Sequence, residues 1–163
     1  MKTLCAMLLV LLTAACANRD PFAQLMGKPD PDDEKRLFTR DKAIDLHLKG
    51  RELAPVEGIW AWSDNLYEVV IFRNAGAAQK SRYADYDYIG LITDARDTER
   101  RSDVKLLLKE TSLPSAYNGI LIGPQGQRYG AAFIYKGNTM ETSVPSGPYG
   151  AQQKIELLRA YPR

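Results

Sequence analysis

From residue 56 to the C-terminus, short apolar runs alternate with stretches of turn-forming residues. The apolar runs occupy residues 58–62, 67–72, 88–93, 104–109, 119–122, 129–135, 140–144 and 155–161. Short runs at this spacing, bounded by Gly, Pro, Asn, Asp and Ser, are typical of antiparallel all-β domains. No long helical pattern separates them, so parallel βαβ units are not expected. The sequence predicts an all-β fold, either a small antiparallel barrel of about eight strands or a sandwich, and closure into a barrel would remove exposed strand edges.

The run at residues 104–109 indicates which face of its strand is buried. Val104, Leu106 and Leu108 lie at alternate positions, and Lys105 and Lys109 lie on the opposite face. This alternation is typical of a strand with one face in the core and the other in solvent. We therefore expect both lysines on the solvent face.

The final run places a charged residue on its apolar face. Ile155, Leu157, Arg159 and Tyr161 occupy alternate positions, so they share one side of the strand. Burying a guanidinium group is costly unless it finds partners. We therefore expect Arg159 to have specific partners on a neighbouring element.

The side chains predicted to face the barrel interior are mostly bulky. They include Trp60, Trp62, Tyr67, Val69, Ile71, Leu106, Leu108, Phe133 and Tyr135, whereas Gly90, Gly130, Ala131 and Ala132 are small. An eight-stranded barrel is just wide enough to be filled by side chains or to hold one small ligand. We expect a filled interior near Trp60, and the sequence leaves open whether the opposite mouth keeps a modest cavity.

The first 15 residues have the layout of a secretory signal. Lys2 precedes an apolar run at residues 4–12, and the small residues Ala14 and Ala15 follow it. The run is too short for a permanent bilayer span, which takes about 20 residues. We predict residues 1–15 as a signal helix that is removed with Cys5.

Cys16 follows this signal in a context that resembles a bacterial lipobox, where small residues precede a diacylated cysteine. The resemblance implies a membrane anchor on Cys16, and two acyl chains give stable attachment. Ala17 resembles the next residue of lipoproteins sorted to the outer membrane, so we expect an outer-membrane lipoprotein that faces the periplasm. Ordinary cleavage after Ala17 is the alternative, and it would give a secreted or free periplasmic protein.

A tether and a short helix are predicted between the signal and the strands. Residues 16–40 are rich in proline and acidic side chains and would bury little surface, which is typical of a flexible tether. Residues 41–55 follow, and Asp41 and Gly50 are a candidate cap and stop for a short helix. The β-barrel domain is then expected over residues 56–163.

Composition excludes several classes of function. The chain has 163 residues and a net charge of +2, which gives no basic footprint for nucleic acid. One histidine and two cysteines do not suffice for a typical tetrahedral zinc site, so we expect no metal and no cofactor.

Catalytic side chains are equally scarce. The single histidine, His47, precedes the predicted barrel and has no adjacent serine or cysteine nucleophile. Asp85 and Asp87 are the candidate carboxylates for a hydrolase, but they alternate with tyrosines in a pattern typical of a solvated strand. We therefore expect no catalytic residues.

Two motifs resemble known families. Gly58-Ile59-Trp60 matches the G-x-W motif that begins the first strand of lipocalins and related calycins, and Arg159 stands where those barrels carry an arginine across the tryptophan. The resemblance implies that Gly58, Trp60 and Arg159 close one end of a barrel, an arrangement that cation–π stacking favours. Residues 55–60 with the following Tyr67 also resemble a signature of uncharacterised bacterial envelope proteins.

A binding surface and a function follow as expectations. Tyr83, Tyr86 and Tyr88, with Tyr149 in a Pro/Gly-rich loop, form a candidate surface because tyrosine gives broad contact at low entropic cost. The expected function is non-catalytic, lipocalin-like binding of a small apolar or amphipathic molecule. The alternatives are an interaction module whose outer face docks an envelope protein or cell-wall polymer, and, third, a carboxylate hydrolase.

Overall fold

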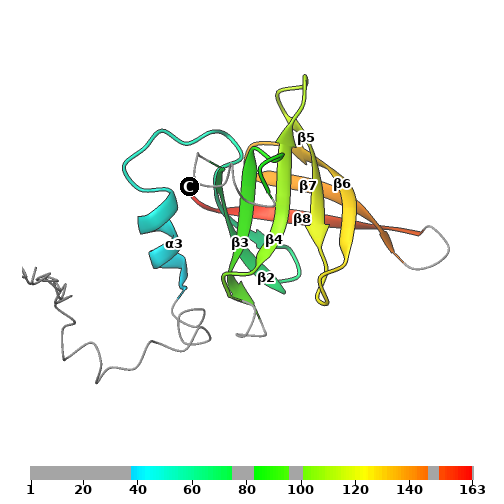
Figure 1. Cartoon of the computed structure of the whole chain (residues 1–163), viewed down its shortest axis with the longest axis horizontal. Coiled ribbons are helices and arrows are strands. Elements are labelled where there is room, and N and C mark those ends of the chain that lie inside the picture. The colour runs from blue at the N-terminus through cyan, green and yellow to red at the C-terminus, as the bar shows by residue number, and fades with distance from the viewer. Residues whose placement is uncertain (1–37, 75–82, 96–100, 147–150, 163) are drawn as a thin grey trace, which may run out of the picture. The chain divides into compact units, whose positions relative to one another are not determined.

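The computed structural model describes residues 38–74, 83–95, 101–146 and 151–162, and it contains a closed barrel of eight antiparallel strands with one short helix (Figure 1). This confirms the predicted all-β barrel. The strands pair in chain order, and β8 closes the barrel by pairing with β1. The elements are α3 (Arg40–His47), β1 (Gly58–Trp62), β2 (Tyr67–Arg73), β3 (Tyr88–Ala95), β4 (Val104–Glu110), β5 (Ala116–Ile122), β6 (Arg128–Tyr135), β7 (Thr139–Ser146) and β8 (Ala151–Tyr161).

The barrel interior is packed with side chains. Alternate residues of the strands point inward and form one apolar cluster, because successive side chains of a strand lie on opposite faces. The buried members of this cluster are Val56, Trp60, Trp62, Val69, Ile71, Tyr88, Ile92, Leu106, Leu108, Tyr117, Leu121, Phe133, Met140, Val144 and Leu157. Every bulky member of the inward set predicted from the sequence belongs to this cluster or packs against it, whereas Gly130 and Ala132 line a groove over β5 to β8.

The helix α3 covers part of the outer face of the barrel. The outward side chains Val70 and Phe72 of β2 belong to a second apolar cluster with Phe38, Ala43 and Ile59, among others. This explains why both faces of residues 67–72 are apolar in the sequence. Polar contacts add to the packing, since Arg40 donates to the Ala160 carbonyl at 3.0 Å and pairs with Glu68 at 3.2 Å.

The helix is shorter than the predicted range 41–55. It begins at Arg40 with Thr39 as the N-cap, whose hydroxyl accepts a hydrogen bond from the Lys42 amide, so the expected cap Asp41 lies in the first turn. Residues 48–55 form turns and irregular chain. The predicted tether 16–40 is also too long at its C-terminal side, because Phe38 is only 8% exposed and packs in the second cluster.

Lys105 does not lie on the solvent face that the alternation predicts. The β3–β4 register shifts between Gly90 and Leu91, which pair with Leu106 and Val104, so Lys105 is the additional residue of a β-bulge. Its side chain is 6% exposed, and its ammonium nitrogen lies 4.0 Å from the centroid of the Tyr67 ring. Lys109, beyond the bulge, is exposed as expected.

The two ends of the barrel differ in what covers them. We call the end where β1 begins and β8 finishes the closed end, because residues 51–57 run across it. The opposite end, which carries the turns at residues 63–66 and 123–127, is called the turn end.

Candidate functional site

Arg159 and Trp60 lie together at the closed end. The guanidinium carbon of Arg159 lies 4.6 Å from the centroid of the Trp60 ring and 5.5 Å from that of Tyr135. The Arg159 guanidinium donates to the carbonyls of Glu57, at 3.3 Å, and Pro55, and to the Tyr135 hydroxyl, at 3.3 Å. The charge is therefore held by an aromatic face and by backbone oxygens, the partners that a half-buried guanidinium requires.

Gly58 is needed where β1 and β8 meet. Its φ is +147°, and a Cβ added there would lie 2.2 Å from the carbonyl oxygen of Tyr161. Any other residue would force β8 away from β1 at this point. The three residues of the lipocalin-like resemblance, Gly58, Trp60 and Arg159, are thus close together in space at one end of the barrel.

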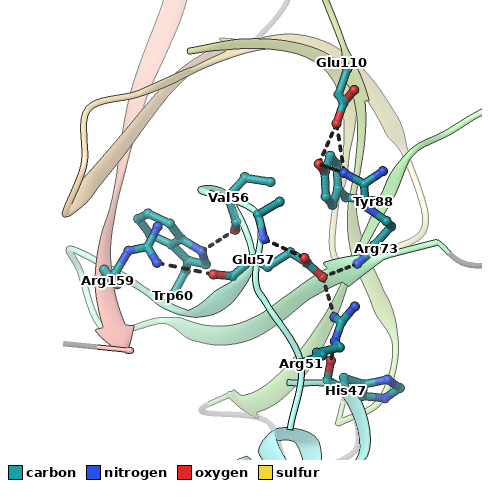
Figure 2. A network of polar contacts seen from close by, with 10 residues as sticks. His47, Arg51, Val56, Glu57, Trp60, Arg73, Tyr88, Glu110 and Arg159 are labelled. Carbon is teal, nitrogen blue, oxygen red and sulfur yellow. Dashed lines mark hydrogen bonds and ion pairs between the residues drawn. The ribbon is translucent and has the colours of Figure 1, made fainter. Parts of the chain in front are cut away.

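A buried carboxylate organises the chain that crosses the closed end, as Figure 2 shows. Glu57 is 1% exposed. Its Oε1 accepts from the Arg73 amide at 2.7 Å and from the Arg51 guanidinium, and its Oε2 accepts from the Ala54 amide at 2.9 Å. Because an unpaired buried carboxylate is costly, these donors tie residues 51–57 to β2.

Sequence analysis gave Glu57 no role, although it stands directly before the G-x-W motif. An acidic residue within an apolar stretch is the only sequence signal, and its partners Arg51 and Arg73 lie on separate segments. The backbone on either side is also fixed, since the Trp60 indole donates to the Val56 carbonyl at 2.9 Å.

A second polar group lies beside the first at the closed end (Figure 2). The Tyr88 hydroxyl donates to Glu110 at 2.6 Å, and Arg73 donates to both, at 2.9 Å and 3.3 Å. Burial and the hydrogen bond to Glu110 raise the pKa of Tyr88. Burial, and then the negative charge of Glu110, raise the pKa of Tyr117, whose ring meets that of Tyr88 edge-on. Both tyrosines are therefore neutral at physiological pH, and Tyr88 acts as a hydrogen-bond donor.

The turn end carries a pocket of about 290 Å³. It lies where β4 and β5 separate, because their ladder ends at the Leu106–Leu121 pair. The lining residues are Tyr83, Ile92, Asp103, Val104, Lys105, Ile122, Gly123, Pro124, Gly126 and Arg128. Ile92 belongs to the barrel core, so the pocket reaches from the rim to the top of the packed interior.

Of the candidate tyrosines that the structure describes, Tyr83 and Tyr86 lie together and Tyr88 lies apart from them in the core. Tyr83 and Tyr86 share one turn before β3, in which the Tyr86 amide donates to the Tyr83 carbonyl at 3.1 Å. Tyr83 lines the turn-end pocket, and the Tyr86 hydroxyl lies 3.5 Å from the Arg128 guanidinium. Tyr88 is 1% exposed within the core and so cannot contribute to an outer surface. Tyr149 lies outside the described residues, as does Cys16.

Two of the remaining catalytic candidates, His47 and Asp87, have structural partners. His47 stacks on Phe72, with ring centroids 3.9 Å apart, and meets Phe38 edge-on. Burial, and then the charge of Arg51, lower the pKa of His47. The Asp87 carboxylate accepts from the Glu110 amide at 2.8 Å, whereas Asp85 is exposed. The stacking of His47 on Phe72 joins α3 to β2, and the hydrogen bond to Asp87 joins the turn before β3 to β4.

The ranges 38–74, 83–95, 101–146 and 151–162 hold neither a metal-binding cluster nor a membrane-spanning helix. Among these residues, no group of three or more His, Cys, Asp or Glu side chains is placed to hold a metal ion. No helix in the same ranges has the length and apolar character needed to cross a bilayer.

Comparisons with known proteins give no match to a protein-family model, to a curated protein or to a solved structure.

Proposed function

We propose that the protein is a non-catalytic envelope lipoprotein that binds a small amphipathic molecule carrying an anionic group at the turn end of its barrel. The observation that carries this proposal is the turn-end pocket, which lies at the end of the barrel opposite Arg159 and Trp60. Its volume of about 290 Å³ is near the lower limit of ligand pockets, and this favours a small ligand.

The lining of the pocket favours an amphipathic ligand. Ile92, Val104 and Ile122 supply apolar wall, and Gly123 and Gly126 line the pocket as well. Apolar walls with a few fixed polar groups are typical of small-molecule sites.

The charges of the pocket favour an anionic group on that ligand. Lys105 and Arg128 contribute two cations against the single carboxylate of Asp103, so the lining has a net positive charge. Arg128 is exposed at the rim, where its planar guanidinium is suited to a carboxylate, sulfonate or phosphate.

Because side chains fill the interior, the proposed ligand site lies at the mouth of the barrel and not in its middle. A lipocalin-like ligand would occupy the space that Trp60, Leu106, Phe133 and their neighbours fill here. The resemblance to lipocalins therefore concerns the residues of the closed end, whereas the proposed ligand site lies at the opposite end.

The envelope location is proposed from the N-terminal sequence. Lys2, the apolar run at residues 4–12 and Cys16 support export and acylation, which would hold the barrel at the outer membrane on the periplasmic side. A ligand site on a membrane-anchored barrel would meet molecules released from or moving to the lipid surface.

The test uses the full chain held in zwitterionic lipid nanodiscs, with empty nanodiscs as the blank. Sodium 4-phenylbutanoate is titrated calorimetrically, and 4-phenylbutanol is the uncharged comparison. We expect the carboxylate to bind and the alcohol to bind at least fivefold more weakly. Arg128→Glu should weaken the carboxylate at least fivefold, whereas Lys109→Glu, the same charge change on the outer face of β4, should change it less than twofold. Equal effects of the two variants, or no binding by the parent, would contradict the proposal.

A second function, docking of an envelope protein through the outer face, is favoured by a groove of about 700 Å³ over β5 to β8.

A further inference from the structure

The ladder between β6 and β7 is much shorter than the ladders on either side of it. β6 pairs with β7 only from Ala132–Ser143 to Tyr135–Met140, whereas its pairing with β5 continues to Arg128. β7 in turn pairs with β8 as far as Ser146. Within the described residues, the stretch 128–131 of β6 therefore has a strand partner on one edge only. We call the gap between this stretch and β7 the β6–β7 seam.

The sequence of β7 explains why the ladder ends there. Two residues beyond the Ala132–Ser143 pair, the same register would place Gly130 opposite Pro145. Proline has no N–H, so it cannot donate to the Gly130 carbonyl. The Lys136 amide donates to the Thr139 carbonyl, so the main-chain groups of Thr139 point toward β6. Main-chain groups alternate in direction along a strand, so those of residue 145, six positions later, also point toward β6. The missing donor therefore interrupts the β6 ladder and leaves the pairing of Pro145 with Gln152 in β8 intact.

The main-chain groups of β6 that face the seam can be assigned in the same way. The Tyr135 amide donates to the Ser115 carbonyl on the β5 side, and the Lys136 amide donates toward β7. The β5–β6 register has no shift, so alternation continues along the strand. Ala131 and Tyr129 therefore direct their N–H groups toward β5, whereas Gly130 and Arg128 direct theirs into the seam.

The groove of about 700 Å³ lies over this seam and is lined by small and polar residues. They are Asn118, Gly119, Gly130, Ala131, Ala132, Ile134, Glu141, Thr142, Ser143, Gln152 and Lys154. A Cβ added at Gly130 would meet no atom within 4 Å, so the outer face of β6 is open at this residue. An exposed strand edge of this kind is a template for pairing with an added strand.

The charges around the groove favour an acidic partner. The Glu141 carboxylate lies 2.9 Å from the Lys136 ammonium and 3.2 Å from that of Lys154. Hydrogen bonds from these two lysines lower the pKa of Glu141. With Arg128 exposed at the end of β6, three cations face the carboxylates of Glu141 and of Glu156, which pairs with Glu141 from β8, and these charges sum to +1.

We propose that the β6–β7 seam binds an extended acidic peptide segment of a partner protein, which pairs with the Arg128 and Gly130 main chain as an added strand. The backbone supplies the pairing, and Lys154 and Arg128 select acidic side chains over basic ones. This site shares only Arg128 with the turn-end pocket, and it extends the second candidate function by naming the chemistry of its partner.

The first test is backbone amide hydrogen exchange of the full chain in nanodiscs. Without peptide, the amides of Gly130 and Arg128 should exchange at least tenfold faster than those of Ala131 and Tyr129, which serve as internal controls on the same strand. A capped hexapeptide of alternating glutamate and valine should slow exchange at Gly130 and Arg128 selectively. Slow exchange at Gly130 in the free protein would overturn the proposal.

The second test separates strand pairing from other modes of binding. Two peptides are compared, one N-methylated at its odd residues and one at its even residues. One pattern should weaken binding at least tenfold and the other less than twofold, because only one set of alternate amides faces β6. Replacement of the glutamates by lysine, or Lys154→Glu in the protein, should weaken binding at least fivefold, and Lys109→Glu should not. Equal effects of both methylation patterns, or a concentration-dependent dimer with no peptide binding, would overturn the proposal. Lys154→Glu should leave 4-phenylbutanoate binding unchanged, so the two sites can fail independently.

Discussion

The guanidinium carbon of Arg159 lies 4.6 Å from the centroid of the Trp60 ring, and the Trp60 indole donates to the Val56 carbonyl. The same guanidinium reaches the carbonyls of Pro55 and Glu57. One side chain of the last strand thus holds the first strand and the segment that precedes it. The hydrogen bond from Arg159 to Glu57 joins two segments that are more than a hundred residues apart in the sequence.

Removing this contact should destabilise the barrel. Arg159→Ala is expected to lower the free energy of unfolding by about 1–4 kcal/mol, because it removes the cation–π contact and leaves carbonyls without donors. Trp60→Ala should have an effect of similar or larger size through the loss of core packing. Urea denaturation followed by circular dichroism measures both. Arg128→Ala is the matched control, since Arg128 is exposed, and it should change stability by less than about 0.5 kcal/mol. Equal stability of Arg159→Ala and the parent would show that the stack does not hold the closed end.

Glu57 should be as important as Arg159 for the same end of the barrel. In Glu57→Gln, the new amide group would face one of the donors that now surround the carboxylate, among them the Arg73 and Ala54 amides. A loss of about 2–4 kcal/mol in unfolding free energy is expected, because a buried charged acceptor is replaced and a donor is left unpaired. Glu52→Gln changes an exposed carboxylate of the same segment and should have little effect. If both variants unfold at the same urea concentration, the Glu57 network contributes no stability.

Gly58 and Gly130 offer a comparison between two glycines of the same barrel. Gly58→Ala should lower stability by more than about 2 kcal/mol, since the added methyl group would clash with the Tyr161 carbonyl. Gly130→Ala should raise stability by about 0.4–1 kcal/mol, because its Cβ meets no atom and the unfolded chain loses entropy. Thermal melts of the two variants give the test. A destabilised Gly130→Ala variant would indicate that a neighbouring segment covers the β6 edge.

The sequence was sufficient to predict the strands because their alternation reports directly on burial. All eight apolar runs correspond to strands, and the inward set around Trp60 and Phe133 lies in one cluster. Arg159 was identifiable because a charge on an apolar face requires a partner. These features depend on local pattern alone.

The features that could not be predicted depend on pairing between segments. Lys105 is buried because of a register shift between β3 and β4, and a one-residue bulge leaves no mark in an alternating sequence. Tyr88 belongs to the core and not to a tyrosine surface, because its ring packs against Tyr117 of β5 inside the barrel. The helix begins after Thr39 and not at Asp41, since both residues are good caps and the packing of Phe38 decides between them.

His47 should make stability depend on pH in a defined window. Burial against Phe72 and Phe38, and the charge of Arg51, lower its pKa below the ordinary value of 6.5 in the folded protein. As the pH falls through 6.5, the unfolded chain therefore binds a proton that the folded protein does not, and the free energy of unfolding decreases by at most about 1.4 kcal/mol per pH unit. The stability is fully present above pH 6.5 and is lost as the pH falls toward the folded-state pKa. Because His47 is the only histidine, His47→Phe should reduce this slope between pH 7.5 and 5.5. Urea titrations of both proteins at several pH values measure the difference, and parallel pH profiles for parent and variant would show that His47 is not responsible.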